Sequence, residues 1–106
     1  MKRRNKLYDR IVKNPKNVRY ADFLKLMRTY GYEERTKRGA ARTFVFDPSV
    51  LGRTEADFSH IMEYIQFFPV HKPHHSGDAV SPFKVKKALE MIELIETVME
   101  EVEDGE

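Results

Sequence analysis

Cysteine is absent from the 106 residues of this sequence. The chain can therefore form no disulfide framework and no thiolate metal site, and it suits a reducing compartment. Long apolar runs are also missing, since no segment approaches the roughly 20 residues of a membrane span. No apolar signal-peptide segment follows the charged start of the chain. We expect no membrane association, and the cytoplasm is the expected location.

Basic residues are missing from the last part of the chain, and acidic residues are scarce in the first part. Residues 88–106 carry eight Asp and Glu and no Lys or Arg, whereas residues 1–46 carry 14 Lys and Arg against four Asp and Glu. Residues 47–87 are balanced, with five of each sign. This segregation indicates a polyanionic partner at one end of the molecule. A solvated surface whose charges merely lie apart is the alternative interpretation.

Length and composition indicate one soluble domain spanning residues 1–106. The chain is 41% hydrophobic and 34% charged, which is typical of a globular protein, and it is too short for two independent cores. The periodicity of apolar residues predicts a short helix at 5–13, a helix from Tyr20 that stops before Gly31, strands at 32–38, 43–47 and 64–71, and a long helix at 82–102. The predicted class is α+β: helix, three-stranded antiparallel sheet, helix, with a short N-terminal helix and a long C-terminal one.

Three local patterns refine this fold. Phe44 and Phe46 alternate with Val45, so the two aromatic rings are expected in the core. Pro69 cannot donate to a strand ladder, which predicts that the third strand lies at an edge or bulges. Thr54 followed by Asp57 resembles a capping box and predicts a short helical turn within 54–63.

The last helix carries an apolar stripe longer than a small sheet needs. Pro82 suits its first position, and apolar residues then recur at steps of three and four, at Val85, Ala88, Ile92, Ile95, Met99 and Val102. We expect the far end to fray, to meet the N-terminal helix, or to contact a partner, including a second copy of the chain. Residues 98–106 form an acidic tail.

Histidines gather in the segment between the third strand and the last helix, which reads His71-Lys72-Pro73-His74-His75. Free histidine titrates near neutrality, so His71 and His74 are candidates for proton transfer, and Lys72 for holding a phosphate. A surface turn with solvated histidines is the simpler interpretation. A zinc site is a third, but the spacing matches no standard helical zinc motif, and we predict neither a metal nor a cofactor.

A second group of cations flanks the predicted turn at Gly39. These residues can follow a phosphate backbone from the end of a sheet; they are Arg35, Lys37, Arg38 and Arg42. Lys84 adds a further candidate phosphate contact in the first turn of the last helix.

Several motifs, in this order, resemble the HicA family of toxins. They cover roughly residues 18–97, and the most specific of them is the His-Lys-Pro-His loop before a helix with a basic first turn. The matching segments are residues 20–27, 30–33, 39–44, 71–74 and 81–89. The resemblance implies a fold like that of double-stranded-RNA-binding domains. It also implies a cytoplasmic mRNA endonuclease held inactive by a HicB-like antitoxin.

The chain departs from the family pattern at the turn before the second strand. A glycine-serine-histidine sequence there commonly carries a catalytic histidine, whereas this chain has Ala40 in place of the serine and Ala41-Arg42 where the histidine would stand. Residues 49–63 and the acidic tail are additional. Three functions remain open. The first is a metal-independent mRNA endonuclease that uses His71 and His74, and the second is a non-catalytic module that binds RNA or protein on the same scaffold. The third is a purely structural partner protein that dimerises through the long acidic helix.

Overall fold

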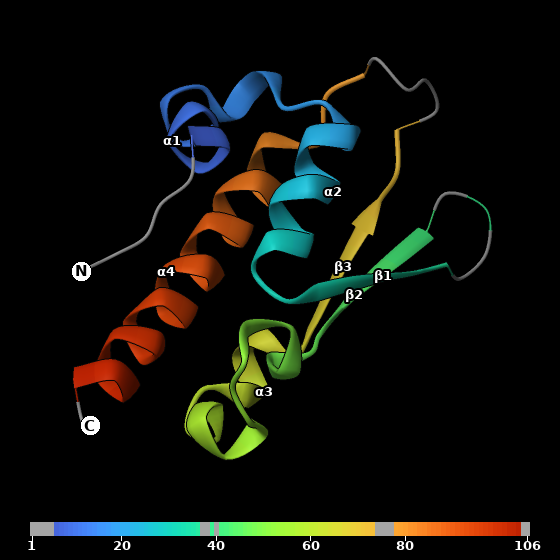
Figure 1. Cartoon of the computed structure of the whole chain (residues 1–106). Coiled ribbons are helices and arrows are strands. Elements are labelled where there is room, and N and C mark those ends of the chain that lie inside the picture. Colours follow the sequence, from blue (N-terminus) through green and yellow to red (C-terminus); the bar gives the residue numbers. More distant parts are fainter. Residues whose placement is uncertain (1–5, 37–38, 40, 74–77, 105–106) are drawn as a thin grey trace.

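Helices pack against one face of a three-stranded antiparallel sheet in the computed structural model, which describes residues 6–36, 39, 41–73 and 78–104 (Figure 1). The elements follow one another as α1 (Lys6–Lys13), η1 (Pro15–Asn17), α2 (Tyr20–Thr29), β1 (Tyr32–Thr36), β2 (Ala41–Phe46), η2 (Pro48–Leu51), η3 (Glu55–Phe58), α3 (Met62–Ile65), β3 (Phe67–His71) and α4 (Pro82–Asp104). The predicted α+β class is confirmed, with its short first helix and long last helix. Among the described helices, none has the length and apolarity needed to cross a membrane.

The sheet has the strand order β1-β2-β3, and its register decides which side chains face the helices. Tyr32 lies opposite Phe46, and Phe44 lies opposite Phe68. These four side chains are buried, whereas Phe67 on the other parity of β3 is 59% exposed. One face of the sheet therefore forms the core and the other faces solvent. Pro69 lies on an edge strand, as predicted.

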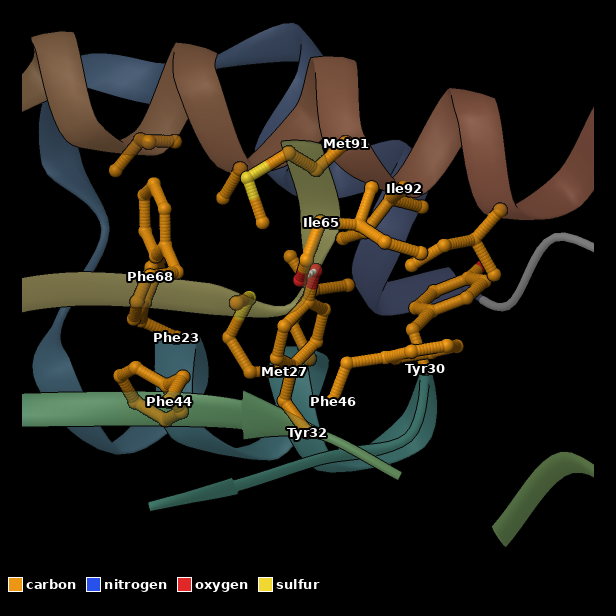
Figure 2. Close-up of a cluster of buried hydrophobic side chains, with 14 of the residues drawn as sticks. Phe23, Met27, Tyr30, Tyr32, Phe44, Phe46, Ile65, Phe68, Met91 and Ile92 are labelled. Carbon is orange, nitrogen blue, oxygen red and sulfur yellow. Dashed lines mark hydrogen bonds between the residues drawn. The ribbon is translucent and has the colours of Figure 1, made fainter. Parts of the chain in front are cut away.

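The core forms where α2 and α4 cross the inner face of the sheet (Figure 2). The ring of Phe23 on α2 meets Phe44 edge-on at 5.7 Å between centroids and lies 6.3 Å from Phe68. Both phenylalanines of β2 are buried, as predicted. The stripe of α4 is wider than its spacing predicted, because Met91 and Val98 are buried beside the expected residues.

The loop between α2 and β1 needs a glycine at one point. Gly31 has φ +92°, and a Cβ there would come within 3.1 Å of both the Asp47 carbonyl oxygen and the Phe46 ring. The left-handed helix stop predicted at Gly31 is confirmed.

Residues 49–63, which the HicA resemblance does not cover, extend the core. Phe58 of η3 is fully buried, and its ring meets Phe46 edge-on at 5.0 Å. The Thr54 amide donates to the Asp57 carboxylate at 3.0 Å, as the capping-box pattern predicted. This additional segment therefore covers the end of the core that contains Phe46.

Two strand boundaries differ from the prediction. Tyr64 and Ile65, which were predicted to start the third strand, belong to α3 (Met62–Ile65), which puts Ile65 in the core and leaves Tyr64 exposed. The ladder starts beyond α3, where the Phe46 amide donates to the Gln66 carbonyl at 2.9 Å. The second strand, β2, begins at Ala41, two residues before its predicted start at Thr43, because Ala41 still pairs with His71.

The middle of α4 contacts the chain's own N-terminal helix and the end of α2. The Tyr8 hydroxyl of α1 donates to Glu93 at 3.3 Å, and its ring lies 6.1 Å from Tyr30. Tyr30 in turn donates to Glu96 of α4 at 3.2 Å. At the far end of the stripe Met99 and Val102 are partly buried against the core, and a contact of this end with a partner or a second copy of the chain stays a prediction.

A buried hydroxyl links the sheet to α3, and its ionisation should lower the stability of the fold at alkaline pH. Tyr32 donates to the Ile65 carbonyl at 2.6 Å, and burial raises the pKa of its phenol above the ordinary value. A raised pKa in the folded state favours the protonated form. Its contribution to stability is therefore fully present below about pH 10, the unfolded value, and is lost as the pH rises above it.

Tyr32→Phe should lower the free energy of unfolding by about 1–3 kcal/mol at neutral pH, because it removes a buried partner of the Ile65 carbonyl. It should also weaken the loss of stability above about pH 10. Urea unfolding at neutral and alkaline pH measures both effects. Tyr64→Phe, at a tyrosine that is 68% exposed, is the matched control and should change neither. Equal alkaline sensitivity in the wild type and Tyr32→Phe would contradict the assignment.

Candidate functional site

Two charged side chains lie on the inner face of the sheet, at the end where the core gives way to solvent. Glu34 shares its parity on β1 with the buried Tyr32, and Arg42 shares its parity on β2 with the buried Phe44. Both therefore point to the side of the sheet that the helices cover. Their side chains are 20% and 15% exposed, respectively.

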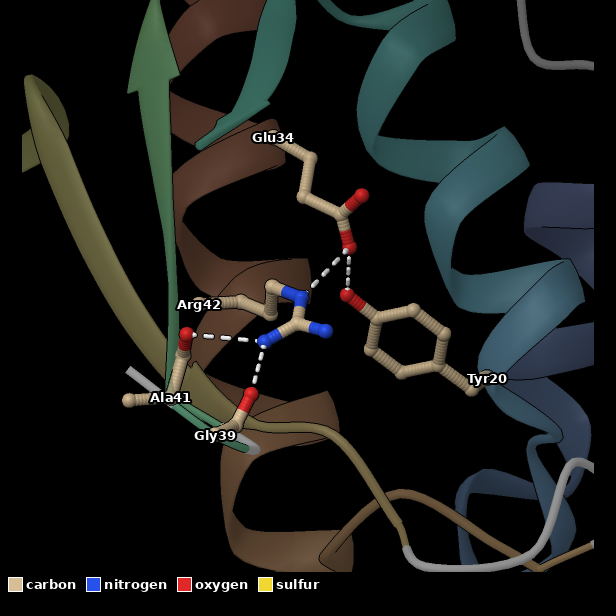
Figure 3. A network of polar contacts seen from close by, with 5 residues as sticks. All are labelled: Tyr20, Glu34, Gly39, Ala41 and Arg42. Carbon is tan, nitrogen blue, oxygen red and sulfur yellow. Dashed lines mark hydrogen bonds and ion pairs between the residues drawn. The ribbon is translucent and has the colours of Figure 1, made fainter. Parts of the chain in front are cut away.

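Tyr20, the first residue of α2, joins these two charges (Figure 3). Its hydroxyl donates a hydrogen bond to Glu34 Oε2, and Arg42 Nε lies 3.8 Å from the same oxygen. Arg42 is held from its other side too, because its Nη1 donates to the carbonyls of Gly39 at 2.6 Å and Ala41 at 3.0 Å. The guanidinium is thus fixed between the turn and the carboxylate.

The Tyr20 hydroxyl stays protonated at neutral pH. Burial raises the pKa of this phenol, and the hydrogen bond to Glu34 and the negative charge of Glu34 raise it further. The positive charges of Arg42 and Arg28 act in the opposite direction but do not cancel the rise. Tyr20 therefore acts as a hydrogen-bond donor, because a protonated phenol can donate a hydrogen bond to an anionic acceptor while it keeps its proton.

Lys72 brings a second cation to the same tyrosine. Its ammonium lies 5.6 Å from the centroid of the Tyr20 ring, which is cation–π range. Lys72 keeps the parity of the buried Val70, two residues earlier, and so lies on the helix side of the sheet. We refer to Tyr20, Glu34, Arg42 and Lys72 as the Tyr20 cluster.

Lys84 lies on the first turn of α4, on the same side of the sheet as this cluster. Its ammonium is 5.3 Å from the centroid of the Phe68 ring. Phe68 and Val70 are two residues apart on β3, so both side chains lie on the helix side of the sheet. Three of the phosphate-binding candidates, Arg42, Lys72 and Lys84, thus lie on the helix side of the sheet.

His71 faces the other way. It is exposed on the outer face, directly across from Ala41. Arg35 is also exposed and on the outer parity of β1. The sequence-based hypothesis required His71, Arg42 and Lys72 to act on the same phosphate. The structure does not bring His71 together with the two cations. The remaining predicted residues, Lys37, Arg38 and His74, lie outside the described residues.

Sequence reasoning missed Tyr20 and Glu34 as site residues. Tyr20 was predicted only as the first residue of its helix. Its side chain is buried, and its hydroxyl donates to the carboxylate of Glu34. Glu34 was predicted only as a residue of the strand at 32–38. Its spacing of two from the buried Tyr32 was the available signal, since that parity places it toward the helices.

No metal ligand set is formed within the part of the chain that the structure describes: no three His, Cys, Asp or Glu side chains gather there. None of the protein-family models, curated proteins or solved structures compared with this chain matches it. The HicA resemblance therefore rests on the sequence motifs alone, and the site's chemistry has to be argued from its own residues.

Proposed function

We propose that this chain binds RNA by holding phosphates on the helix side of the sheet, around the Tyr20 cluster. The observation that carries the proposal is the meeting of Arg42 and Lys72 around one tyrosine. A guanidinium with a fixed plane and a nearby ammonium are the groups that bind phosphate oxygens.

The distribution of charge supports this assignment. Residues 1–46 carry an excess of ten positive charges, and the acidic residues of 88–106 run along α4 to the chain's end. In Figure 1 the C-terminal end of α4 lies on the opposite side of the molecule from the ends of β2 and β3 that carry Arg42 and Lys72. A polyanion would be drawn to one end and repelled from the other.

The biological role that we propose follows the sequence resemblance: a HicA-like toxin of a toxin–antitoxin pair, with mRNA as its target and a HicB-like antitoxin as its protein partner. In its first form the protein is a metal-independent mRNA endonuclease. His71 and His74 would transfer the protons. Because His71 lies on the outer face, the bond that is cleaved would belong to a phosphodiester next to a phosphate that the cations hold on the helix side.

A non-catalytic binding module is the second form of the proposal, and one observation favours it. The residue directly across from His71 is Ala41, so the position best placed to pair with this histidine carries no titratable group. RNA binding is common to both forms, and cleavage separates them.

Lys72→Ala tests the RNA-binding proposal directly. The expected result is weaker binding of single-stranded RNA by a similar factor for every sequence, with a salt dependence reduced by about one phosphate contact. Fluorescence anisotropy with labelled RNAs over a range of salt concentrations measures both quantities. Lys6→Ala removes the same charge from the exposed start of α1 and should leave the salt slope unchanged. No RNA binding at low salt would overturn the proposal.

A further inference from the structure

One hydrogen-bond donor and one cationic group of the Tyr20 cluster converge on a single oxygen atom. The Tyr20 hydroxyl donates a hydrogen bond to Glu34 Oε2, and Arg42 Nε forms an ion pair with the same oxygen at 3.8 Å (Figure 3). The oxygen of a carboxylate and the oxygen of a phosphate are equivalent acceptors for such donors, since both carry negative charge. The position of Glu34 Oε2 therefore marks a point at which the protein stabilises an oxyanion.

Contacts other than those to Glu34 also hold the Tyr20 ring and Arg42 in place. Arg42 is tied to the carbonyls of Gly39 and Ala41 through Nη1. The ring of Tyr20 is 5% exposed and packs within the core at the start of α2. Removing the carboxylate would leave both donors close to their present positions.

Glu34 is able to leave. Its side chain is 20% exposed at the edge of the core, and its rotatable bonds allow the carboxylate to turn toward water while the backbone remains in β1. The Arg42 Nε to Glu34 contact of 3.8 Å is longer than a close charge-assisted hydrogen bond. The ion pair between Arg42 and Glu34 is therefore a loose one.

We propose that the Tyr20 hydroxyl and Arg42 form a specific site for one RNA phosphate oxygen, and that Glu34 is an internal occupant that competes with RNA for it. The inference rests on the proposed RNA binding. It identifies one phosphate contact at which Glu34 lowers the affinity of the protein for RNA. Lys72, over the ring of Tyr20, supplies positive charge to the incoming phosphate. Glu34 thereby holds affinity below what the cations alone would give.

Glu34→Gln is the main test, with Glu33→Gln as its matched control. The two glutamates are neighbours on β1, so each variant removes one negative charge from almost the same place. Glu33 points to the outer face, opposite Val45, and is exposed. Only the Glu34 variant replaces the carboxylate at the oxyanion site with a neutral amide, which competes less well with a phosphate.

RNA affinity of Glu34→Gln should rise roughly tenfold, the factor that corresponds to 1.4 kcal/mol at room temperature. The slope of log affinity against log salt should steepen by about 0.7–0.9, one additional phosphate contact. Glu33→Gln should leave the slope unchanged and alter affinity by less. Tyr20→Phe in the Glu34→Gln background should remove most of the gain, because the variant lacks the hydroxyl donor.

Glu34→Asp keeps the net charge and covers the case in which Glu34→Gln does not fold. Its carboxylate is one methylene shorter and retracts from the two donors, so RNA affinity should again rise several-fold. Circular dichroism of each variant establishes that it is folded before binding of a labelled single-stranded RNA is measured.

Several results would overturn the inference. Equal effects of Glu33→Gln and Glu34→Gln would mean that only overall charge matters. Weaker RNA binding by Glu34→Gln and Glu34→Asp would mean that the carboxylate positions Arg42 instead of competing with RNA. In both cases wild-type RNA binding would stand. Failure of the wild type and all variants to bind RNA at low salt would remove the proposed function, and this inference with it.

Discussion

RNA affinity should fall by a factor of ~10³ or more between about 50 and 200 mM salt, if about six phosphates are contacted. The reason is the excess of ten positive charges in residues 1–46, because each phosphate that a protein cation neutralises releases a counterion. Titrations of a labelled RNA at several salt concentrations give the slope directly. A flat dependence would mean that the basic half does not contact the backbone.

Arginine variants on the two faces of the sheet show where the phosphates lie. Arg42→Ala should reduce the salt slope by about one contact, because its side chain belongs to the Tyr20 cluster on the helix side. Arg35→Ala removes the same charge from the exposed outer face and should leave the slope nearly unchanged. If the order is reversed, RNA lies on the outer face, and the assignment of the Tyr20 cluster is wrong.

The order of elements was predictable because the strong signals were local. The helix stop at Gly31, the core positions of Phe44 and Phe46, and the edge position of Pro69 each follow from one residue's geometry or from the period of two in a strand. The start of the third strand was not predictable in this way. Tyr64 and Ile65 suit a strand by residue type, but tertiary packing places them in α3, where Ile65 fills the core.

The site was predictable only in part, for a different reason. The sequence singled out Arg42 and Lys72, and the structure brings them together around Tyr20. It also grouped His71 with Lys72 because they are adjacent, although adjacent residues of an extended chain point to opposite faces. That parity was readable from the sequence. The contact between Tyr20 and Glu34 was not, because it depends on how α2 crosses the sheet.

The parity of the strands also leads to the prediction that concerns catalysis. Ala41-Arg42 is the pair of residues at which the family resemblance would place a catalytic histidine, and of the two Ala41 is the direct cross-strand neighbour of His71. Side chains in such pairs have Cβ atoms about 4.5–5.5 Å apart. Two imidazoles at that separation can serve one phosphodiester, one taking the proton of the 2′-hydroxyl and the other protonating the leaving 5′-oxygen.

Ala41→His should therefore raise the rate of RNA cleavage by about 10²–10⁴-fold over the wild type, the usual contribution of one general acid or base. RNA affinity should change little, because Ala41 is not among the phosphate-binding cations. Cleavage of a labelled RNA should survive EDTA, and a 2′-deoxy substrate should stay intact. Ala41→Asn is the matched control for a polar side chain that does not titrate, and it should give no gain.

His71→Ala in the Ala41→His background decides whether the two histidines act as a pair. The added activity should disappear in this double variant, whereas His60→Ala, at a residue between η3 and α3, should leave it intact. A gain that EDTA abolishes would show instead that the cross-strand histidines hold a metal ion, since imidazole is a common zinc ligand. If Ala41→His binds RNA and gains no activity, His71 is not part of an acid–base pair. The non-catalytic module is then the better account, because the scaffold would hold phosphate on one face with no chemistry on the other.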